Sequence, residues 1–247
     1  MGVKRRQRVR RGVLILAFAL FPLTFHYYSP VVILAGAAVG VATGSLLLFS
    51  AQFVFSLFLG RAFCGWACPV GGLSEWLAEV RDRPAPGGRW DLIKWLIWLP
   101  WVGMLAVLVA RAGGYSRIEP LYMMPGGLPL SEWSGAIAYL GVLVLVAVLG
   151  LAVGRRAFCH LVCWMAPGMI LGSRLSRILH LPRLHLVAHP EQCIRCARCD
   201  HACPMSLGVS AMVASGEMDH DECVLCQSCV DVCPKNAISN RFGRPDR

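Results

Sequence analysis

The sequence is poor in charged residues, and the shortage is concentrated near the N-terminus. Only 15% of the 247 residues are Asp, Glu, Lys or Arg, whereas soluble globular proteins have about 25%. No charged residue occurs between Val13 and Leu59. Because one membrane crossing takes about 20 apolar residues, this stretch is long enough for two crossings. The composition therefore excludes an ordinary soluble globular protein.

Sequence signatures of several common cofactors are also absent. No Cys-x2-Cys-His occurs, which excludes the usual attachment site of c-type haem. No glycine-rich dinucleotide fingerprint and no P-loop occurs, so nothing indicates a nucleotide substrate. His26 is the one histidine in the expected spans. It leaves no bis-histidine haem site, but an intramembrane histidine is a candidate haem ligand or quinol proton acceptor.

Acidic residues are outnumbered, with 14 Asp and Glu against 24 Lys and Arg. Beside long apolar stretches, this excess indicates membrane orientation rather than nucleic-acid binding. The apolar stretches predict four spans, at about Val13–Tyr28, Val32–Leu59, Leu92–Ala110 and Trp133–Val153. Basic residues gather in the N-terminal tail and in the segments after the second and fourth spans. The positive-inside rule therefore places both ends of the chain in the cytoplasm.

Two features of the first pair of spans predict how these spans meet the membrane surface and each other. Tyr27 and Tyr28 suit an aromatic belt at the outer interface, with Pro30 in the turn. A row of small residues at a spacing of four lets another helix approach closely, or simply belongs to a glycine-rich membrane helix. The row consists of Gly36, Gly40 and Gly44.

Eight of the twelve cysteines form a four-thiol unit that occurs twice and closes each time on Cys-Pro. The spacing is that of bacterial ferredoxins with two [4Fe–4S] clusters, in which the fourth cysteine of each run ligates the other cluster. Zinc sites usually present two separated cysteine pairs, and a disulfide framework needs an oxidising compartment. The first cluster is therefore assigned to Cys193, Cys196, Cys199 and Cys233. The second is assigned to Cys223, Cys226, Cys229 and Cys203.

The other four cysteines form two Cys-x3-Cys pairs, Cys64 with Cys68 and Cys159 with Cys163. They belong to an internal repeat, because Arg-Ala-Phe-Cys ends at Cys64 and again at Cys159, each time after two predicted spans. A spacing of four puts both sulfurs of a pair on one helical face. The four thiols are predicted to form a shared redox or metal site near a quinone-accessible face. Redox-active thiols and buried structural cysteines are the alternatives. His160, inside the second pair, is a candidate to tune or ligate such a centre.

This arrangement of spans, Cys-x3-Cys pairs and a C-terminal double-cluster run resembles the NapH/MauN-type membrane ferredoxins. It is also similar to the polyferredoxin part of nitrous-oxide-reductase regulatory membrane proteins. The resemblance implies a quinol dehydrogenase or electron-transfer subunit in the bacterial inner membrane. The Cys-x3-Cys-Pro positions of the family correspond to Cys64, Cys68 and Pro69, and in the second copy to Cys159 and Cys163. Trp164 stands where the second proline would be, which departs from the family pattern.

The predicted fold is an α-helical membrane protein with a C-terminal α+β ferredoxin domain of the bacterial two-cluster kind. Four transmembrane helices would form two repeated hairpins. The expected divisions are residues 1–173 for the membrane domain, 174–190 for a linker and 191–247 for the ferredoxin domain. The linker is expected either to lie along the membrane surface or to form a short connecting helix packed on the ferredoxin domain.

The expected function is electron transfer between the quinone pool and a partner redox protein, as a redox subunit of a quinol dehydrogenase-type complex. The expected cofactors are two [4Fe–4S] clusters, with quinone and a further metal or iron–sulfur centre as candidates. Two alternatives remain: a maturation or assembly factor that reduces a metal or thiol for another enzyme, and a redox sensor. The expected location is the bacterial inner (cytoplasmic) membrane, multi-pass, and no nucleic-acid partner is expected.

Overall fold

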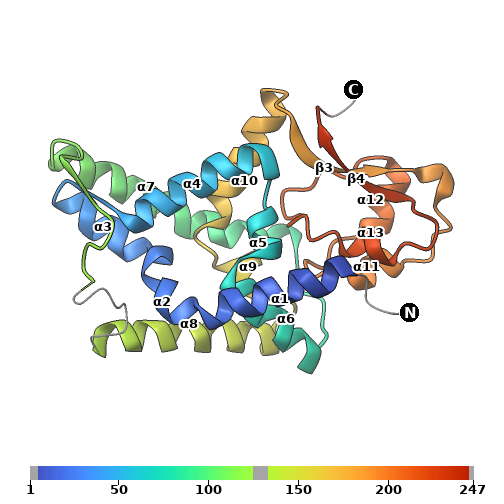
Figure 1. The fold of residues 1–247 in the computed structure, drawn as a ribbon, viewed down its shortest axis with the longest axis horizontal. Coiled ribbons are helices and arrows are strands. Elements are labelled where there is room, and N and C mark those ends of the chain that lie inside the picture. Colours follow the sequence, from blue (N-terminus) through green and yellow to red (C-terminus); the bar gives the residue numbers. More distant parts are fainter. Residues whose placement is uncertain (1–4, 125–132, 245–247) are drawn as a thin grey trace.

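The structure is a computed structural model that describes residues 5–124 and 133–244. The long helices run along the long axis of the molecule, and the cysteine-rich C-terminal quarter of the chain, residues 183–244, sits at one end (Figure 1). This end of the molecule is called the C-terminal or ferredoxin half, and the part before it the helical half. The start of α1 (Arg5–Ala19) and the end of β4 (Ile238–Gly243) both lie at that end. The outermost residues of the predicted domains, 1–4 and 245–247, and the segment 125–132 lie outside the described residues.

The N-terminal segment is a broken helix rather than one continuous span. Its elements are α1, α2 (Phe21–Thr24), η1 (Phe25–Tyr28) and α3 (Pro30–Ala38). The axis bends by 58° between α1 and the α2–η1 segment. Pro22 lies in the first turn of α2, where its missing N–H costs no helical hydrogen bond. Pro30 begins α3, and the side chain of Ser29 caps that helix by accepting from the N–H of Val32. The prediction of a turn at Pro30 is therefore wrong.

The predicted second span, 32–59, is also interrupted. After α3 come β1 (Val41–Thr43), which pairs in parallel with β2 (Arg117–Glu119), and then α4 (Gly44–Leu59). Gly40 turns the chain between α3 and β1 with a φ of +70°, which glycine adopts without strain. The glycines at 36, 40 and 44 therefore lie on different elements, and the predicted small-residue row on one helix is wrong. Gly44 instead lets the carbonyl oxygen of Pro120 approach so closely that a Cβ would clash with it.

The rest of the helical half contains helices of very different length. They are α5 (Ala62–Trp66), α6 (Pro69–Val80), η2 (Gly88–Leu92), α7 (Ile93–Arg111), α8 (Trp133–Ala152), α9 (Ala157–Leu161) and α10 (Ala166–Ile178). Among the described residues, two helical stretches are long and apolar enough to cross a membrane, Gly88–Arg111 and Trp133–Ala152. A third is added if the bent N-terminal pair counts as one span. α4 is apolar but has only 16 residues. Four transmembrane helices therefore remain a prediction.

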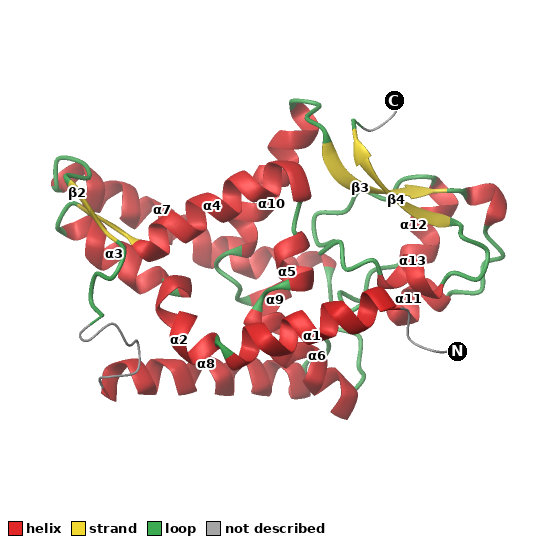
Figure 2. Ribbon diagram, viewed as in Figure 1, coloured by secondary structure: helices red, strands yellow, loops and turns green. Residues whose placement is uncertain are grey.

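The C-terminal half combines short helices with a two-stranded sheet, as expected for an α+β ferredoxin domain (Figure 2). Its elements are β3 (Arg183–Ala188), η4 (Pro190–Gln192), α11 (Arg198–Ala202), α12 (Val209–Ser215), α13 (Ser228–Val232) and β4. β3 and β4 are antiparallel, in a register from Arg183 opposite Gly243 to Ala188 opposite Ile238. The end of α10 and the whole of β3 occupy most of the predicted linker, 174–190. The domain division itself stays a prediction.

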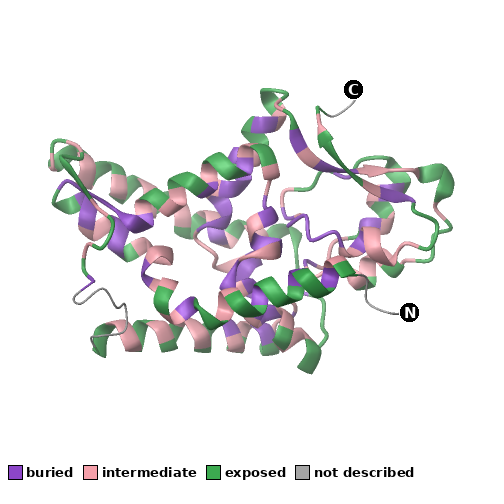
Figure 3. Ribbon diagram, viewed as in Figure 1, coloured by how far each residue is buried: buried purple, intermediate pink, exposed green. Residues whose placement is uncertain are grey.

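Buried residues gather where the helical half meets the C-terminal half, around α5 and α9 (Figure 3). One continuous hydrophobic core contains Cys64 and Cys159 from these two helices together with Cys203, Cys226 and Cys229 from the C-terminal half. The long helices leave large apolar side chains exposed, for example Leu96 of α7 and Ile137 of α8. Such a surface suits a lipid environment.

Tyr28 lies at this junction, and the prediction that it belongs to an outer aromatic belt is wrong. Its ring packs on that of Phe63 with centroids 6.4 Å apart. Its carbonyl oxygen accepts a hydrogen bond of 2.8 Å from the indole N–H of Trp164. The break between α1 and α3 brings the chain to this position, because η1 ends there instead of continuing as a straight helix.

Candidate iron–sulfur sites

Two cavities in the C-terminal half are each lined by four cysteines. The distal cavity is lined by Cys193, Cys196, Cys199 and Cys233. The inner cavity is lined by Cys203, Cys223, Cys226 and Cys229. These are the two sets that the sequence spacing predicts, each with one cysteine from the opposite run. The ligand assignment stays a prediction, and this geometry supports it.

The backbone of both cysteine runs follows the same unusual path. Arg195 and Ala197 have φ values of +52° and +54°, and the matching residues Leu225 and Gln227 have +47° and +61°. Residues with a Cβ rarely adopt this left-handed conformation, which costs about 1–3 kcal/mol each and persists where the surroundings impose it. These positive φ angles bend each loop around its cavity. A group bound by the cysteines would supply the constraint, so the residues fit a resident cluster at each cavity.

The four remaining cysteines also come together, at the ends of α5 and α9; they are called the paired-hairpin site. Burial raises the pKa of the Cys68 thiol well above its usual value, and the nearby thiols of Cys64, Cys159 and Cys163 raise it further. Burial likewise raises the pKa of Cys163 to about 12. Bound metal deprotonates a coordinating thiol outright, so such buried thiols would become thiolates on binding a metal or cluster.

Buried cations surround the paired-hairpin site. Arg61 and Arg156 are 2% and 1% exposed and occupy equivalent positions of the two repeats. Together with Lys94 they act to lower the pKa of Cys159, although burial outweighs them and raises it. The Nε atoms of both arginines are buried without a hydrogen-bond partner among the described residues. Buried donors are rarely left unpaired, and a negatively charged group held by four thiolates would supply acceptors.

The spacing of the sulfur atoms argues against zinc. A tetrahedral zinc site with Zn–S bonds of about 2.3 Å holds its sulfurs about 3.8 Å apart. Among the residues that the structure describes, no three cysteine sulfurs lie within 4.8 Å of one another. None of the three cysteine sites therefore presents its sulfurs at the spacing of a zinc tetrahedron.

The paired-hairpin site lies directly against the inner cavity. Gly65, next to Cys64, meets the carbonyl oxygen of Val224 so closely that a Cβ at this position would overlap it. The indole N–H of Trp66 donates a hydrogen bond of 3.1 Å to the carbonyl oxygen of Leu225. Val224 and Leu225 separate two of the cysteines that line the inner cavity. The two cysteine sites therefore share a backbone contact with no side chain between them at Gly65.

Sequence reasoning missed the buried ion pairs that hold this junction. Arg61 donates to Glu222 Oε2 at 2.7 Å, and Lys94 donates to Glu222 Oε1 at 2.5 Å. Burial acts to raise the pKa of Glu222, but Arg61 and Lys94 outweigh it and the pKa is lowered. The carboxylate therefore stays charged directly beside Cys223. The repeated Arg-Ala-Phe-Cys motif was the available signal, because it contains Arg61.

A second network of buried ion pairs lies within the helical half and holds its helices together. Arg10 and Arg156 both donate to Glu75 Oε1 at 2.6 Å. Arg156 also donates to the carbonyl oxygen of Cys64 at 2.8 Å, which ties the second repeat to the first. Burial acts to raise the pKa of Glu75, but these arginines lower it overall. Breaking such a buried pair leaves an uncompensated charge and costs about 3–5 kcal/mol.

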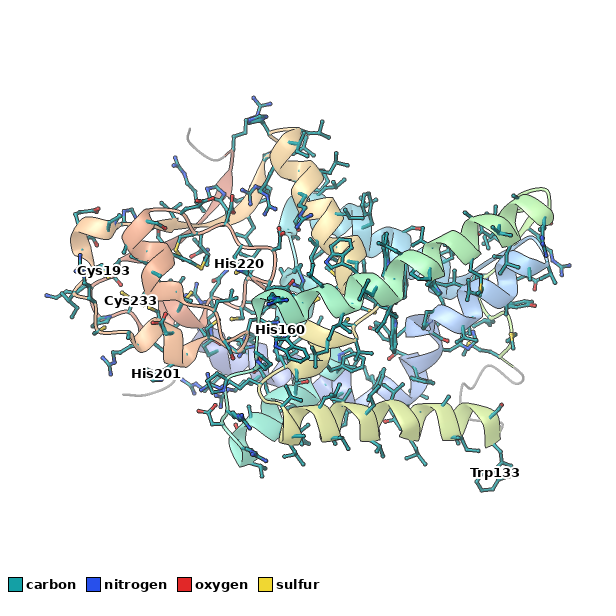
Figure 4. The ribbon with its side chains drawn as sticks, turned by 180° about the vertical axis from the view of Figure 1, so that it is seen from behind. Trp133, His160, Cys193, His201, His220 and Cys233 are labelled. Atoms are coloured by element: carbon teal, nitrogen blue, oxygen red, sulfur yellow. The ribbon has the colours of Figure 1, made fainter. Side chains whose placement is uncertain are left out.

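His160 is buried at the junction (Figure 4). Its Nδ1 lies 2.6 Å from Asp91 Oδ1, and these two residues with Glu222 form a group whose ligand atoms lie within 4.8 Å of one another. Lys94 Nζ, 2.5 Å from Glu222 and 3.9 Å from Asp91, already supplies a cation there. The group is therefore an ion-pair network rather than a vacant metal site. His26 is buried in η1, and its proposed haem or quinol role stays a prediction.

Comparison with known proteins agrees with the cysteine chemistry. A family described as "4Fe-4S binding domain" matches residues 41–86 and 134–181, which cover both Cys-x3-Cys pairs. A family described as "4Fe-4S dicluster domain" matches residues 192–238, which cover both ferredoxin-type runs. No solved structure matches the chain. The sequence and the fold together define a membrane-associated 4Fe–4S ferredoxin-type electron-transfer protein.

Three relatives narrow this class. MJ0750 of Methanocaldococcus jannaschii, an uncharacterized protein, is 30% identical over 75% of this chain and 74% of its own length. The ferredoxin-type protein NapH of Escherichia coli (strain K12) is 25% identical over 91% of this chain and 76% of its own length. YccM of Escherichia coli (strain K12) is 26% identical over 82% of this chain, which spans 57% of YccM. The chain belongs to the NapH/MauN-type membrane ferredoxins, which are related to NosR.

Proposed function

We propose that this protein carries electrons between the membrane quinone pool and a partner redox protein through three iron–sulfur centres in series. The observation that carries the proposal is the shared core. Cys64 and Cys159 of the paired-hairpin site lie in the same buried core as Cys203, Cys226 and Cys229 of the inner cavity. The inner cavity in turn lies within the same small domain as the distal cavity. The order would be paired-hairpin site, inner cavity, distal cavity.

The third centre rests on three supports. Both copies of the repeat match a 4Fe–4S binding family. No three of the sulfurs lie at the mutual spacing of a zinc site. Two buried arginine Nε atoms lack acceptors that a negatively charged group would provide. Cys64, Cys68, Cys159 and Cys163 would hold that group as thiolates. When bound, it would supply one-electron redox chemistry at the boundary between the helical half and the ferredoxin half.

A groove beside the two-cluster half suits the headgroup of a quinol. Its volume is about 1110 Å³, and it lies between α1, α6 and the helices α11 and α13. Its lining includes the apolar side chains of Leu14, Ile15 and Trp76 together with charged residues of both signs. Ser228 and Pro204, which adjoin cysteines of the inner cavity, also line it. A neutral amphiphile such as quinol fits this balance of charge. Each quinol would release two electrons and two protons, and the clusters would take the electrons singly.

The proposed topology has four membrane crossings with both ends in the cytoplasm of a bacterial inner membrane. The broken segment from α1 to α3 would be the first crossing and α4 the second. The excess of basic residues in the segments on the C-terminal-half side supports this orientation. Inactivity of alkaline phosphatase fused after β4, beside activity of the same enzyme inserted at Gly113, would support the topology. The reverse pattern would contradict it.

Iron content and cluster spectroscopy test the function. Anaerobically purified protein is expected to contain about twelve iron atoms per chain, four for each of three cubane clusters. The double variant Cys64→Ser/Cys159→Ser is expected to fall to about eight, and the surface variant Ser215→Ala is expected to keep the full complement. A wild-type content of about eight would overturn the third centre and leave the other two.

The quinone end is tested separately. Membranes that contain the wild-type protein are mixed anaerobically with menadiol, and the reduced clusters are followed by electron paramagnetic resonance. Menadiol is expected to reduce the clusters in the wild type, and more slowly in Cys64→Ser/Cys159→Ser, because the groove also reaches the paired-hairpin site through Arg10, which donates to the carbonyl oxygen of Gly65. Full reduction by dithionite and none by menadiol in the wild type would overturn the quinone connection.

A further inference from the structure

The two cavities of the ferredoxin half differ in their access to solvent. All twelve cysteines lie in the described residues, and Cys196 of the distal cavity is the exposed one among them. Three of the four cysteines of the inner cavity are buried: Cys203, Cys226 and Cys229. Cys193 and Cys233 lie at the end of the molecule away from His160 and the long helices (Figure 4). The distal cavity is therefore the site from which electrons can reach a water-soluble molecule most directly.

The rim of the distal cavity is apolar and basic. Ile194, Pro234 and Lys235 line the cavity and are exposed, Ile194 at 57%, and the exposed Arg195 follows Ile194 in the chain. The cavity lining includes the basic residues Arg198 and Lys235 and no carboxylate. The lining of the inner cavity, in contrast, has no charged residue of either sign. The positive charge is therefore specific to the exposed cavity rather than a general property of the two sites.

Glu191, Asp200 and Asp231 lie within two residues of distal-cavity cysteines in the chain, but none of them lines the cavity. Asp200 follows Cys199, but its carboxylate accepts hydrogen bonds from the backbone N–H of Ser210 at 2.6 Å and from its hydroxyl at 2.5 Å. Glu191 is exposed and lies 3.7 Å from His189. Neither carboxylate lines the distal cavity. An approaching molecule therefore meets an exposed apolar residue within a positively charged rim.

We propose that the rim of the distal cavity, formed by Ile194, Arg195, Pro234 and Lys235, is the docking surface for a water-soluble redox protein that carries an acidic patch around its own redox centre. This inference rests on the proposed function, because it requires a cluster in the distal cavity. One electron passes in each encounter, so that one centre is oxidised as the other is reduced, and no bond forms or breaks. Charge complementarity would raise the encounter rate and align the two centres, while Ile194 would supply the apolar contact.

Small redox probes of opposite charge test the docking surface without the natural partner. The detergent-solubilised full-length protein, loaded with clusters, is reduced with dithionite and freed of excess reductant. It is then oxidised in a stopped-flow instrument by anionic ferricyanide or by cationic hexaammineruthenium(III). The double variant Arg195→Glu/Lys235→Glu is compared with Arg81→Glu/Arg89→Glu, which makes the same change in net charge at exposed residues of the helical half.

At low ionic strength, the rim variant is expected to react with ferricyanide about tenfold more slowly than the wild type and with the cationic probe faster. High salt is expected to remove both differences. The control variant is expected to change either rate by less than about twofold. Equal effects of the rim and control variants, or no effect of the rim variant on either probe, would overturn the proposal.

Iron content and the cluster spectrum, measured on the same samples, keep the test valid. If the glutamate variant loses iron, Arg195→Gln/Lys235→Gln replaces it, with about half the expected change in charge dependence. Reduction by menadiol is measured in parallel. A wild type that menadiol does not reduce, but whose oxidation depends on rim charge, would refute the quinone connection while supporting the docking surface. Normal menadiol reduction with no dependence on rim charge would do the opposite.

Discussion

The two copies of the Cys-x3-Cys repeat share a motif and differ in what they hold. Both place Arg-Ala-Phe-Cys at the start of a short helix, α5 or α9, with a buried arginine three residues before the first cysteine. Arg61 of the first copy binds Glu222 of the ferredoxin half. Arg156 of the second copy binds Glu75 of the helical half. The two equivalent arginines therefore bind different parts of the molecule. The second copy still contacts the ferredoxin half, because Arg155 donates to the carbonyl oxygens of His201 and Cys203.

The residue after the first cysteine follows the same division. In the first copy it is Gly65, where the backbone of Val224 leaves no room for a side chain. In the second copy it is His160, whose imidazole binds Asp91 at the start of the α7 stretch. The repeat thus supplies four thiols with approximate symmetry, while its flanking residues face two different partners. The repeated motif supplies the four cysteines, and the residues that differ between the copies determine which part of the molecule each copy contacts.

The largest effects are expected from replacing Arg61 and Arg156, which test whether the two copies have different roles. Arg61→Gln leaves Glu222 with only Lys94 and is expected to weaken the docking of the ferredoxin half by about 3–5 kcal/mol. Limited proteolysis in the exposed turn 179–182 is expected to accelerate by at least tenfold. Arg156→Gln is expected to lower the thermal stability of the helical half in detergent and to leave cleavage of the turn near the wild-type rate.

Arg117→Gln is the matched control for both arginine variants. Arg117 forms an exposed ion pair with Glu119, with side chains 62% and 43% exposed. Such pairs contribute about 0–1 kcal/mol, so neither cleavage nor melting is expected to change. Identical behaviour of Arg61→Gln and Arg156→Gln in both measurements would show that the two copies do not have the separate roles described above.

Gly65→Ala is the next most disruptive change. The new Cβ would overlap the carbonyl oxygen of Val224 and would stand 3.3 Å from Cys226 N, both backbone atoms. Overpacking of this kind costs about 1–3 kcal/mol, and it is expected to separate α5 from the inner cavity. Slower electron transfer from menadiol to the ferredoxin clusters is expected, measured by rapid-freeze electron paramagnetic resonance.

Gly168→Ala in α10 provides the control, because nothing lies within 4 Å of the position that its Cβ would take. An alanine inside a helix is favoured over glycine by about 0.5–1 kcal/mol. Its electron-transfer rate is expected to equal that of the wild type. If Gly65→Ala also transferred electrons at the wild-type rate, the close contact at Gly65 would have no role in the relay.

The smallest effects are expected from replacing Trp66 and Trp164, one in each copy of the repeat. Trp66→Phe removes the hydrogen bond to Leu225 O, and Trp164→Phe removes the one to Tyr28 O. Each is expected to cost about 1 kcal/mol, but at different places. Hydrogen exchange is expected to rise in residues 223–229 for the first variant and in residues 25–30 for the second. Exchange that rises in the same segment for both would contradict the assignment.

The cysteine sets were easier to predict from the sequence than the course of the backbone. Cysteine spacing is local, so the runs that begin at Cys193 and Cys223 were enough to indicate the two four-cysteine sets. The break at 39–43 gave no hydropathy signal, because the residues on both sides of Gly40 are equally apolar. The partnership of Arg61 with Glu222 joins residues 161 positions apart, and no local periodicity encodes such a pair. Tyr28 was misplaced for the same reason.

Both copies of the repeat have a proline in the first turn of the helix that follows the cysteines, but at different distances from them. Pro69 follows Cys68 directly and begins α6. In the second copy, Pro167 lies in the first turn of α10, three residues after Trp164. Proline suits both places because the first turn of a helix needs no N–H from it. The departure at Trp164 is therefore a longer connection to the helix rather than loss of the proline.

The short connection between α10 and β3 limits how far the ferredoxin half can travel. Only residues 179–182 separate Ile178 from Arg183. Four extended residues reach at most about 14 Å. A ferredoxin half released from α5 would still be held at high effective concentration and would rebind within the same molecule. It could not act as a diffusing shuttle, so the soluble partner proposed above would have to come to this protein.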